Sequence, residues 1–224
     1  SIKGIICYLY TMAKSSSLDT YNNLRKELSS GGGKPIYFLY GEEDFFLDRL
    51  AETVQGLIPP DQKDFNFDQL YGQDTTPAKV LSIARSFPMM AEKRILLIRN
   101  FMQIAAGAGD AQSGDINDFL PYFDQPNPTT LLVLIDTKKP PGNTTFGKKT
   151  SRHKNVGFYE FKPLPDYLLP DWVMDWTKDR YSKQIDVQSA QLLSQFVGNS
   201  LQLLSVEIDK VCTYVDTSHR ITSE

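Results

Sequence analysis

The chain has 224 residues, of which 41% are hydrophobic and 23% charged, enough to bury a core in one large domain or in a domain with a small partner. The formal net charge of −3 excludes an overall basic field that attracts nucleic acid or membranes, although a local basic face remains compatible with it. Two distant cysteines, Cys7 and Cys212, exclude a disulfide framework, and His153 and His219 have no ligand partner at metal-binding spacing. No apolar run approaches the roughly 20 residues that span a bilayer, so a cytoplasmic protein without membrane contact, metal or cofactor is expected.

The first predicted segment is an N-terminal extension, residues 1–33. Residues 1–11 are treated as an addition upstream of a start at Met12 and are left out of the predicted fold. A helix is predicted over residues 18–28, and the glycine-rich stretch "SSGGGKP" then breaks the chain.

Strands and amphipathic helices alternate over residues 34–164. The predicted strands are residues 36–40, 65–72, 94–99, 129–136 and 156–161. Between them, apolar residues recur at helical spacing: Phe46, Leu50, Val54 and Leu57; Val80, Ile83, Ala84 and Phe87; Ile116, Phe119, Leu120 and Phe123. Because most of the strands are continuously apolar, both faces of their sheet are expected to be covered. The pattern predicts an α/β domain with a five-stranded parallel sheet flanked by helices, and a small-residue loop over residues 107–115.

The strands stop after "KPLPDY", and residues 165–224 read as a small three-helix domain. Its helical stripes are Leu169, Trp172, Val173 and Trp176; Ala190, Leu193 and Val197; Leu201, Leu204, Ile208 and Val211. Gly198 is predicted to end the second helix and Ser200 to cap the third. The two tryptophans share one stripe and are expected in the core.

The turn after the first strand has the frame of a phosphate-binding loop without its chemistry. A working loop reads Gly-x-x-x-x-Gly-Lys-Ser/Thr, whereas Gly41 is followed here by Glu42, Glu43 and Asp44. Carboxylates suit a helix N-terminus but repel phosphate. The strand at residues 94–99 also ends without the Asp-Glu pair that holds Mg²⁺. We therefore predict that the chain does not hydrolyse ATP.

Several segments, taken in order, resemble the delta subunits of bacterial DNA polymerase III clamp loaders. They are "PIYFLYGEEDFFLDRL", "FNFDQLYG", "VLSIARSFPMMAEKRILLIRN", "TTLLVLIDTKKP", "LPDYLLPDWV" and "LLSQFVGNSLQLLSVEIDKVCTYV". The likeness runs from about residue 34 to residue 224. It implies an AAA+-like module without nucleotide, followed by a three-helix lid, and the family's C-terminal collar domain is absent from this sequence.

The resemblance also implies a function. Such a subunit is not an enzyme by itself; it grips the ring-shaped sliding clamp, the beta subunit, and favours its open form during DNA replication. It belongs to the DNA polymerase III holoenzyme, which carries the nucleotidyltransferase activity. Its implied partners are the clamp, the gamma/tau and delta prime subunits through the absent domain, and primed DNA in the assembled complex.

The residues that match the family's clamp-binding wedge are Met89 and Met90, which follow the second helix of the α/β domain. Methionine is common at adaptable binding surfaces. Pro88 stops the helix and extends Phe87, so these two residues are expected to shape the tip. The three charged residues at 92–94 are expected to form its rim. The alternative from the residues alone is that the two methionines cap the core.

A basic segment, "TKKPPGNTTFGKKTSRHK", follows the fourth strand. Its cationic residues are Lys138, Lys139, Lys148, Lys149, Arg152 and Lys154. They are candidates for facing the DNA backbone, and the alternative is a solvated loop and helix face. Two other functions remain open at this point: an ATP-hydrolysing AAA+ protein with an unusual loop, and a nucleic-acid-binding module that uses this segment.

Overall fold

The structure is a computed structural model that describes residues 16–30, 33–105, 114–215 and 220–222. The chain divides into two compact units, one formed by Thr20–Lys162 and the other by the described residues up to Asp19 and from Pro163 onward. Among the described residues, no helix has both the length and the apolar character needed to cross a membrane.

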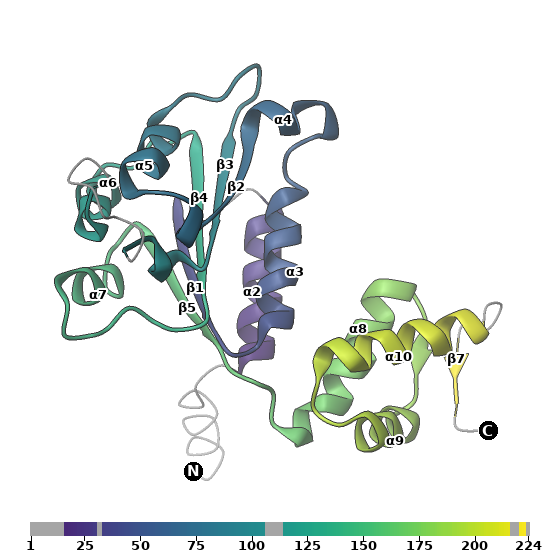
Figure 1. The fold of residues 1–224 in the computed structure, drawn as a ribbon. Coiled ribbons are helices and arrows are strands. Elements are labelled where there is room, and N and C mark those ends of the chain that lie inside the picture. Colours follow the sequence, from purple (N-terminus) through teal and green to yellow (C-terminus); the bar gives the residue numbers. More distant parts are fainter. Residues whose placement is uncertain (1–15, 31–32, 106–113, 216–219, 223–224) are drawn as a thin grey trace, which may run out of the picture. The chain divides into compact units, whose positions relative to one another are not determined.

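The first unit contains a five-stranded parallel sheet (Figure 1). Its strands are β1 (Ile36–Gly41), β2 (Phe67–Tyr71), β3 (Arg94–Arg99), β4 (Thr130–Asp136) and β5 (Val156–Phe161). They are ordered β2-β3-β4-β1-β5, and every pair is parallel. The predicted α/β fold with a five-stranded parallel sheet is confirmed.

Helices cover both faces of this sheet (Figure 1). The helices are α2 (Ser17–Ser29), α3 (Asp44–Gln55), α4 (Lys63–Asn66), α5 (Pro77–Arg85), α6 (Phe119–Asp124) and α7 (Thr145–Thr150). Short 3₁₀ turns lie between them at η1 (Pro60–Gln62), η2 (Gly72–Asp74), η3 (Phe101–Ala105) and η4 (Ile116–Asp118). The side chains of β1 alternate between the two layers: Phe38 belongs to the core cluster that also contains residues of α5, α6 and α7, and those of Tyr37 and Leu39 point to the opposite face.

Helix α2 belongs to this unit from Thr20 onward, and the apolar face of that part packs there. Leu24 and Leu28 are buried, and the ring of Tyr21 stacks on Phe46 of α3 with 4.7 Å between centroids. The Tyr37 hydroxyl of β1 donates a hydrogen bond to the Glu27 carboxylate. Burial and this carboxylate raise the pKa of Tyr37.

The second unit contains the three predicted helices, α8 (Leu169–Tyr181), α9 (Val187–Val197) and α10 (Leu201–Tyr214), after a short turn η5 (Asp166–Leu168). The Ser200 hydroxyl caps α10 by accepting from the Leu203 amide, and Gly198, with φ of +89°, ends α9 as predicted. Trp172 is buried, whereas Trp176 stacks on it at 5.6 Å and is only half-buried. A short parallel pair, β6 (Gln184–Ile185) with β7 (Arg220–Ile221), was not predicted.

Candidate functional site

The loop between α5 and β3 is the candidate site that the sequence predicted. Thr76 caps the start of helix α5, its hydroxyl accepting from the Lys79 amide, and the helix ends at Arg85, before Pro88. Ser86 is already extended, with ψ of 150°. The chain then turns back into β3 through residues 86–93. We call residues 87–90 the tip.

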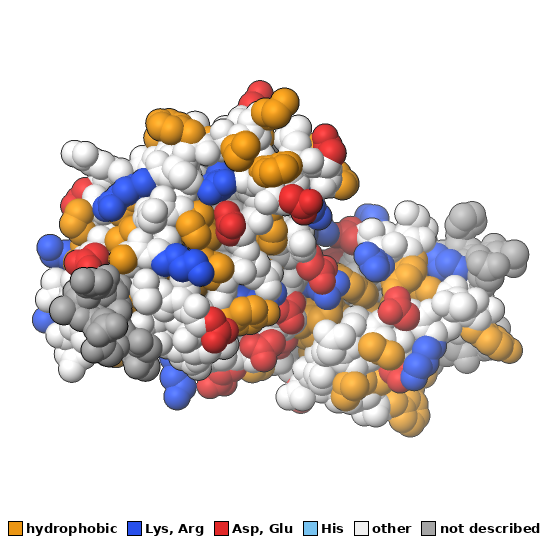
Figure 2. Space-filling view, turned by 45° about the horizontal axis from the view of Figure 1, so that its top comes forward, with side chains coloured by type: hydrophobic (Ala, Val, Ile, Leu, Met, Phe, Trp, Pro, Cys, Tyr) orange, Lys and Arg blue, Asp and Glu red, His pale blue; other side chains and the backbone are white. Residues whose placement is uncertain are grey.

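The tip exposes its apolar side chains. Phe87 is 75% exposed, Met89 55% and Met90 97%, while Pro88 is half-buried. In Figure 2 hydrophobic side chains gather at the top of the larger unit, the end that carries α4 and the α5–β3 loop in Figure 1. Because both methionine side chains are exposed, they do not cap the core, which was the alternative interpretation of the sequence. Phe87 also lies outside α5, so its assignment to the buried helical stripe was wrong.

Met90 has an unusual backbone conformation. Its φ of +52° lies in the left-handed region, which costs a residue other than glycine roughly 1–2 kcal/mol. Such strain persists only where the surrounding structure enforces it. The loop therefore holds Met90 outward at a cost to stability.

Two side chains outside the tip hold this loop. Asn66 is fully buried, and its amide pairs with both the N–H and the C=O of Met89, at 2.7 and 2.8 Å. The Arg94 guanidinium donates to the Ser86 hydroxyl at 2.8 Å and to the Phe65 carbonyl. Of the three predicted rim charges, Glu92 and Lys93 are exposed, but Arg94 is largely buried and braces the loop. Its assignment to the rim was wrong.

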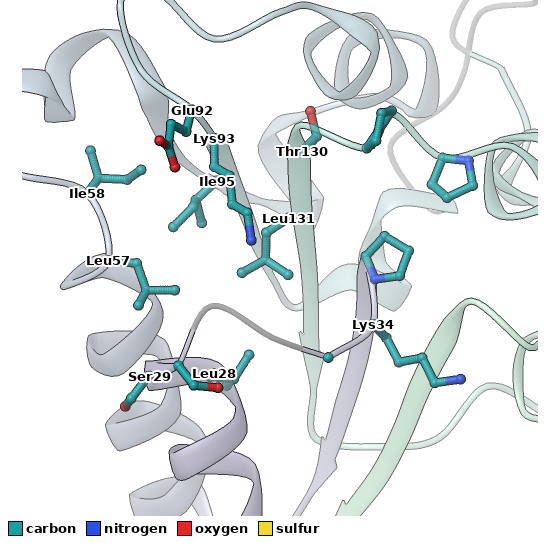
Figure 3. Close-up of a pocket in the computed structure, with 15 residues that line it drawn as sticks. Leu28, Ser29, Lys34, Leu57, Ile58, Glu92, Lys93, Ile95, Thr130 and Leu131 are labelled. Carbon is teal, nitrogen blue, oxygen red and sulfur yellow. The ribbon is translucent and has the colours of Figure 1, made fainter.

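A cavity of about 580 Å³ lies beside this loop at the amino-terminal edge of the sheet (Figure 3). Glu92 and Lys93, just after the tip, form part of its wall, and Leu57 and Leu131 face into it. In parallel α/β sheets, ligands ordinarily bind at the opposite edge, beyond the carboxyl ends of the strands. The tip and this cavity therefore lie at the other end of the strands from a nucleotide site.

The turn after β1 is where a phosphate loop belongs. Gly41 has φ of +141°, and a Cβ atom there would lie 2.0 Å from the Phe161 carbonyl oxygen. The Glu43 N–H donates to the same oxygen at 3.2 Å. The turn thus fastens β1 and α3 to the end of β5 by main-chain contact.

Acidic side chains line the cavity at the carboxyl edge, which has a volume of about 440 Å³. Asp44 stands in the first turn of α3 and is exposed. Asp48 pairs with Arg99 at 2.6 Å, and the Asp136 carboxylate accepts from the Met102 amide at 2.7 Å. In the part of the chain that the structure describes, no group of three or more His, Cys, Asp or Glu residues is placed to hold a metal ion. Three carboxylates and one guanidinium, that of Arg99, therefore line this cavity, and the resulting negative charge disfavours phosphate.

Glu43 differs from its two acidic neighbours because it is buried. Desolvation raises the pKa of Glu43 from 4.5 to about 7, although a hydrogen bond from the Phe45 amide acts in the opposite direction. Glu42 is exposed. Of the three carboxylates predicted to stand together at the helix N-terminus, only two reach solvent.

Burial of Glu43 predicts a pH-dependent stability. Because its pKa is raised in the folded state, the folded chain keeps a proton that the unfolded chain releases above pH 4.5. The free energy of unfolding therefore falls as pH rises from about 4.5 to about 7, by on the order of 2–3 kcal/mol. Glu43→Gln is expected to remove this fall and to be the more stable form at pH 8 in urea titrations. Glu42→Gln, the matched exposed change, should leave the pH profile unaltered; identical profiles for wild type and Glu43→Gln contradict the assignment.

The basic segment does not form one compact patch. Its six cationic side chains, Lys138, Lys139, Lys148, Lys149, Arg152 and Lys154, are all exposed. The first two follow the carboxyl end of β4, and the last two precede the amino end of β5, where the Lys34 amine donates to the Lys154 carbonyl. These two edges of a parallel sheet are ~20 Å apart. The structure brings Lys154 into contact with Lys34 and separates it from Lys138 and Lys139.

Two residues near the tip were missed by the sequence analysis, Phe65 and Asn66. Both were read as part of the strand "FNFDQLYG", whereas they end the short helix α4. No periodic signal marks a single-turn helix, so the pattern alone does not reveal them.

Exposed apolar side chains also occur in the helical unit, Phe196 and Tyr214 among them. The loop 107–115 lies almost wholly outside the described residues.

A family model and a curated relative point to the same family. The family described as "DNA polymerase III, delta subunit" matches residues 37–156. DNA polymerase III subunit delta of Bacillus subtilis is 25% identical over 201 residues, which is 88% of this chain and 57% of the relative. A Helicobacter pylori protein is 24% identical over 132 residues, 59% of this chain and 37% of its own length.

A solved structure extends the likeness to the fold. The DNA clamp loader delta protein of Bacillus subtilis matches with a TM-score of 0.72 at 24% identity, over 90% of this chain and 60% of that chain. The chain thus spans less than two thirds of the length of these relatives.

Proposed function

Because this chain belongs to the DNA polymerase III delta subunit family, we propose that it binds the sliding clamp through the tip and favours the clamp's open form. The chain itself carries out no catalytic step. The binding partner is the ring-shaped beta subunit, and the site consists of Met89 and Met90 with Phe87 and Pro88 beside them.

The observation that carries this proposal is the outward display of an apolar pair on a braced loop. Exposed methionines are flexible and polarisable, and they fit an apolar pocket on a partner. Burying each of Met89 and Met90 contributes roughly 1.5–3 kcal/mol before the ordering costs of association. Since the loop is already held in place, little further ordering is needed when the partner binds.

A subunit of this kind need not pull a ring apart. It shifts the equilibrium towards the open ring by binding that form more tightly than the closed form. A ligand that binds both forms equally shifts nothing, so the proposal requires a difference in affinity between the two. A difference of about 1.4 kcal/mol already changes the ratio of the two forms tenfold.

The turn after β1, residues 41–44, supports the non-catalytic part of the proposal, and we call it the vestigial phosphate turn. Gly41 and Glu43 contact Phe161 in the turn where a phosphate loop belongs, and Asp44 lines the cavity at that edge. The work of ATP hydrolysis then belongs to other subunits of the assembly. Contacts with those subunits, and with DNA through Lys138, Lys139, Lys148, Lys149, Arg152 and Lys154, are part of the same proposal.

The test is co-elution of the purified chain with the sliding clamp encoded by the same genome, in gel filtration without nucleotide. A complex is expected at micromolar concentrations of both proteins. Separate elution of two folded proteins at these concentrations overturns the proposal.

Nucleotide is expected to have no effect on this chain. Calorimetric titration with Mg-ATP should give no binding heat at millimolar ATP, because Gly41 is followed by three acidic residues in place of the Gly-Lys-Ser/Thr cradle. A subunit with an intact loop from the same assembly provides the positive control. Micromolar ATP binding by this chain would favour the rival reading as an ATP-hydrolysing protein.

A further inference from the structure

A second exposed aromatic side chain stands beside the tip. Phe65, in the last turn of α4, is 55% exposed although it lies next to the fully buried Asn66. Neither residue belongs to the α5–β3 loop. They come from the segment that leads into β2, the edge strand next to β3.

The Asn66 side chain ties this segment to the tip. Its Nδ2 donates to the Met89 carbonyl at 2.8 Å and to the Gln62 carbonyl at 3.3 Å, and its Oδ1 accepts from the Met89 N–H at 2.7 Å. An amide that pairs with both main-chain groups of one residue fixes the direction of the chain there. Residue 90, which follows, is the one held at positive φ.

Arg94 ties the two segments together a second time. Its guanidinium donates to the Phe65 carbonyl and to the Ser86 hydroxyl, the latter at 2.8 Å. The loop is therefore fastened to α4 at its start, through Ser86, and in its middle, through Met89. These bonds hold Phe65 and Asn66 beside the loop that carries the tip, at the end of the unit where α4 and the α5–β3 loop lie in Figure 1.

We propose that the clamp-binding surface is composite, with Phe65 as a contact residue from α4 and Asn66 as a positioning residue that keeps the tip in its binding conformation. This inference rests on the proposed function. If the tip were free, only a fraction of molecules would hold Met90 outward, and the apparent affinity would fall by that fraction. Asn66 keeps the tip in the binding conformation before the clamp binds, so the affinity is not reduced in this way. Phe65 adds aromatic area beside the methionine pair.

The contact role is tested with Phe65→Ser, a change at an exposed position that is expected to leave the fold unaltered. Surface plasmon resonance against the immobilised clamp should show Kd raised roughly tenfold. The control is Phe196→Ser, which removes a still more exposed phenylalanine, 86% against 55%, from the helical unit. A Kd for Phe65→Ser equal to that of this control overturns the contact role.

The positioning role is tested with Asn66→Ala at a temperature where melting curves show the variant folded. Kd is expected to rise roughly tenfold, mainly through slower association, because fewer molecules are competent to bind. Asn155→Ala is the matched control. The Asn155 side chain also bonds to main-chain groups, donating to the Phe123 carbonyl at 2.8 Å and to the Asp124 carbonyl at 3.4 Å, and neither group belongs to the tip. It should lower the melting temperature without changing Kd.

A double-mutant cycle separates positioning from a general loss of stability. Asn66→Ala and Met90→Ala together should cost less than the sum of their separate effects on Kd, because both act on the display of one side chain. Additive effects, or a Kd for Asn66→Ala that matches Asn155→Ala, overturn the positioning role. If Asn66→Ala does not fold, Phe65→Ser alone decides the composite surface.

The same data distinguish this inference from the proposed function. Wild-type chain that fails to bind the clamp overturns both. Wild-type binding that is lost in the Met89 and Met90 variants and unchanged in Phe65→Ser and Asn66→Ala overturns the composite surface alone.

Discussion

Replacing Met89 and Met90 together by serine is expected to weaken clamp binding by a hundredfold or more while leaving the melting temperature within a degree or two of wild type. The affinity loss follows from removing two apolar side chains that together contribute about 3 kcal/mol or more on burial, which is roughly 150-fold in Kd. Stability is preserved because both side chains are exposed, Met90 almost entirely. Calorimetry of the clamp titration and a thermal melt check the two halves of the prediction.

The control for this double change is Phe196→Ser, which removes an exposed aromatic side chain from the second unit. It shows whether any loss of exposed apolar surface weakens the complex. The prediction fails if the double variant binds as wild type. It fails equally if the variant melts several degrees lower and still binds, since the pair then belongs to the core.

Replacing Gly41 by alanine is expected to destabilise the sheet unit by roughly 3 kcal/mol or more. A Cβ atom at this position would lie 2.0 Å from the Phe161 carbonyl oxygen, and φ is +141°, which L side chains rarely adopt. The neighbouring atoms are main chain, so no flexible side chain can move aside. Urea denaturation followed by circular dichroism gives the free energy of unfolding.

Gly142→Ala is the matched control, because no atom lies within 4 Å of the position where its Cβ would stand. It is expected to change stability by no more than ~0.5 kcal/mol. The comparison tests whether close packing against β5 is the reason for a glycine at the end of β1. A Gly41→Ala variant as stable as Gly142→Ala would show that close packing against β5 is not the reason.

The sheet was predictable from the sequence because its strands are buried on both faces. Short, continuously apolar runs of this length favour buried strands over helices, as in "RILLIR" and "TTLLVLID". Their alternation with helical segments implies that the strands pair in parallel. The structure bears this out in β3 and β4. The helical unit was predictable for a similar reason: Gly198 and Ser200 are specific stop and start signals, and they mark the ends of α9 and α10.

The details that hold the tip were not predictable, because each depends on residues distant in sequence. Arg94 reads as a rim charge until Phe65 and Ser86 are seen beside it. Asn66 reads as a polar residue on a strand, and its role depends on Met89, 23 positions away. Glu43 has the same helix-start pattern as its neighbours, and only the packing around it distinguishes a buried carboxyl from an exposed one.

The most direct test of the central claim is hydrogen–deuterium exchange of the chain with and without the sliding clamp, in the absence of nucleotide. The account predicts slower exchange confined to peptides covering residues 86–92 and 63–66, with no change at residues 41–48 around the vestigial phosphate turn. Protection at residues 41–48 or in α9 and α10, with the tip peptides unchanged, would contradict it.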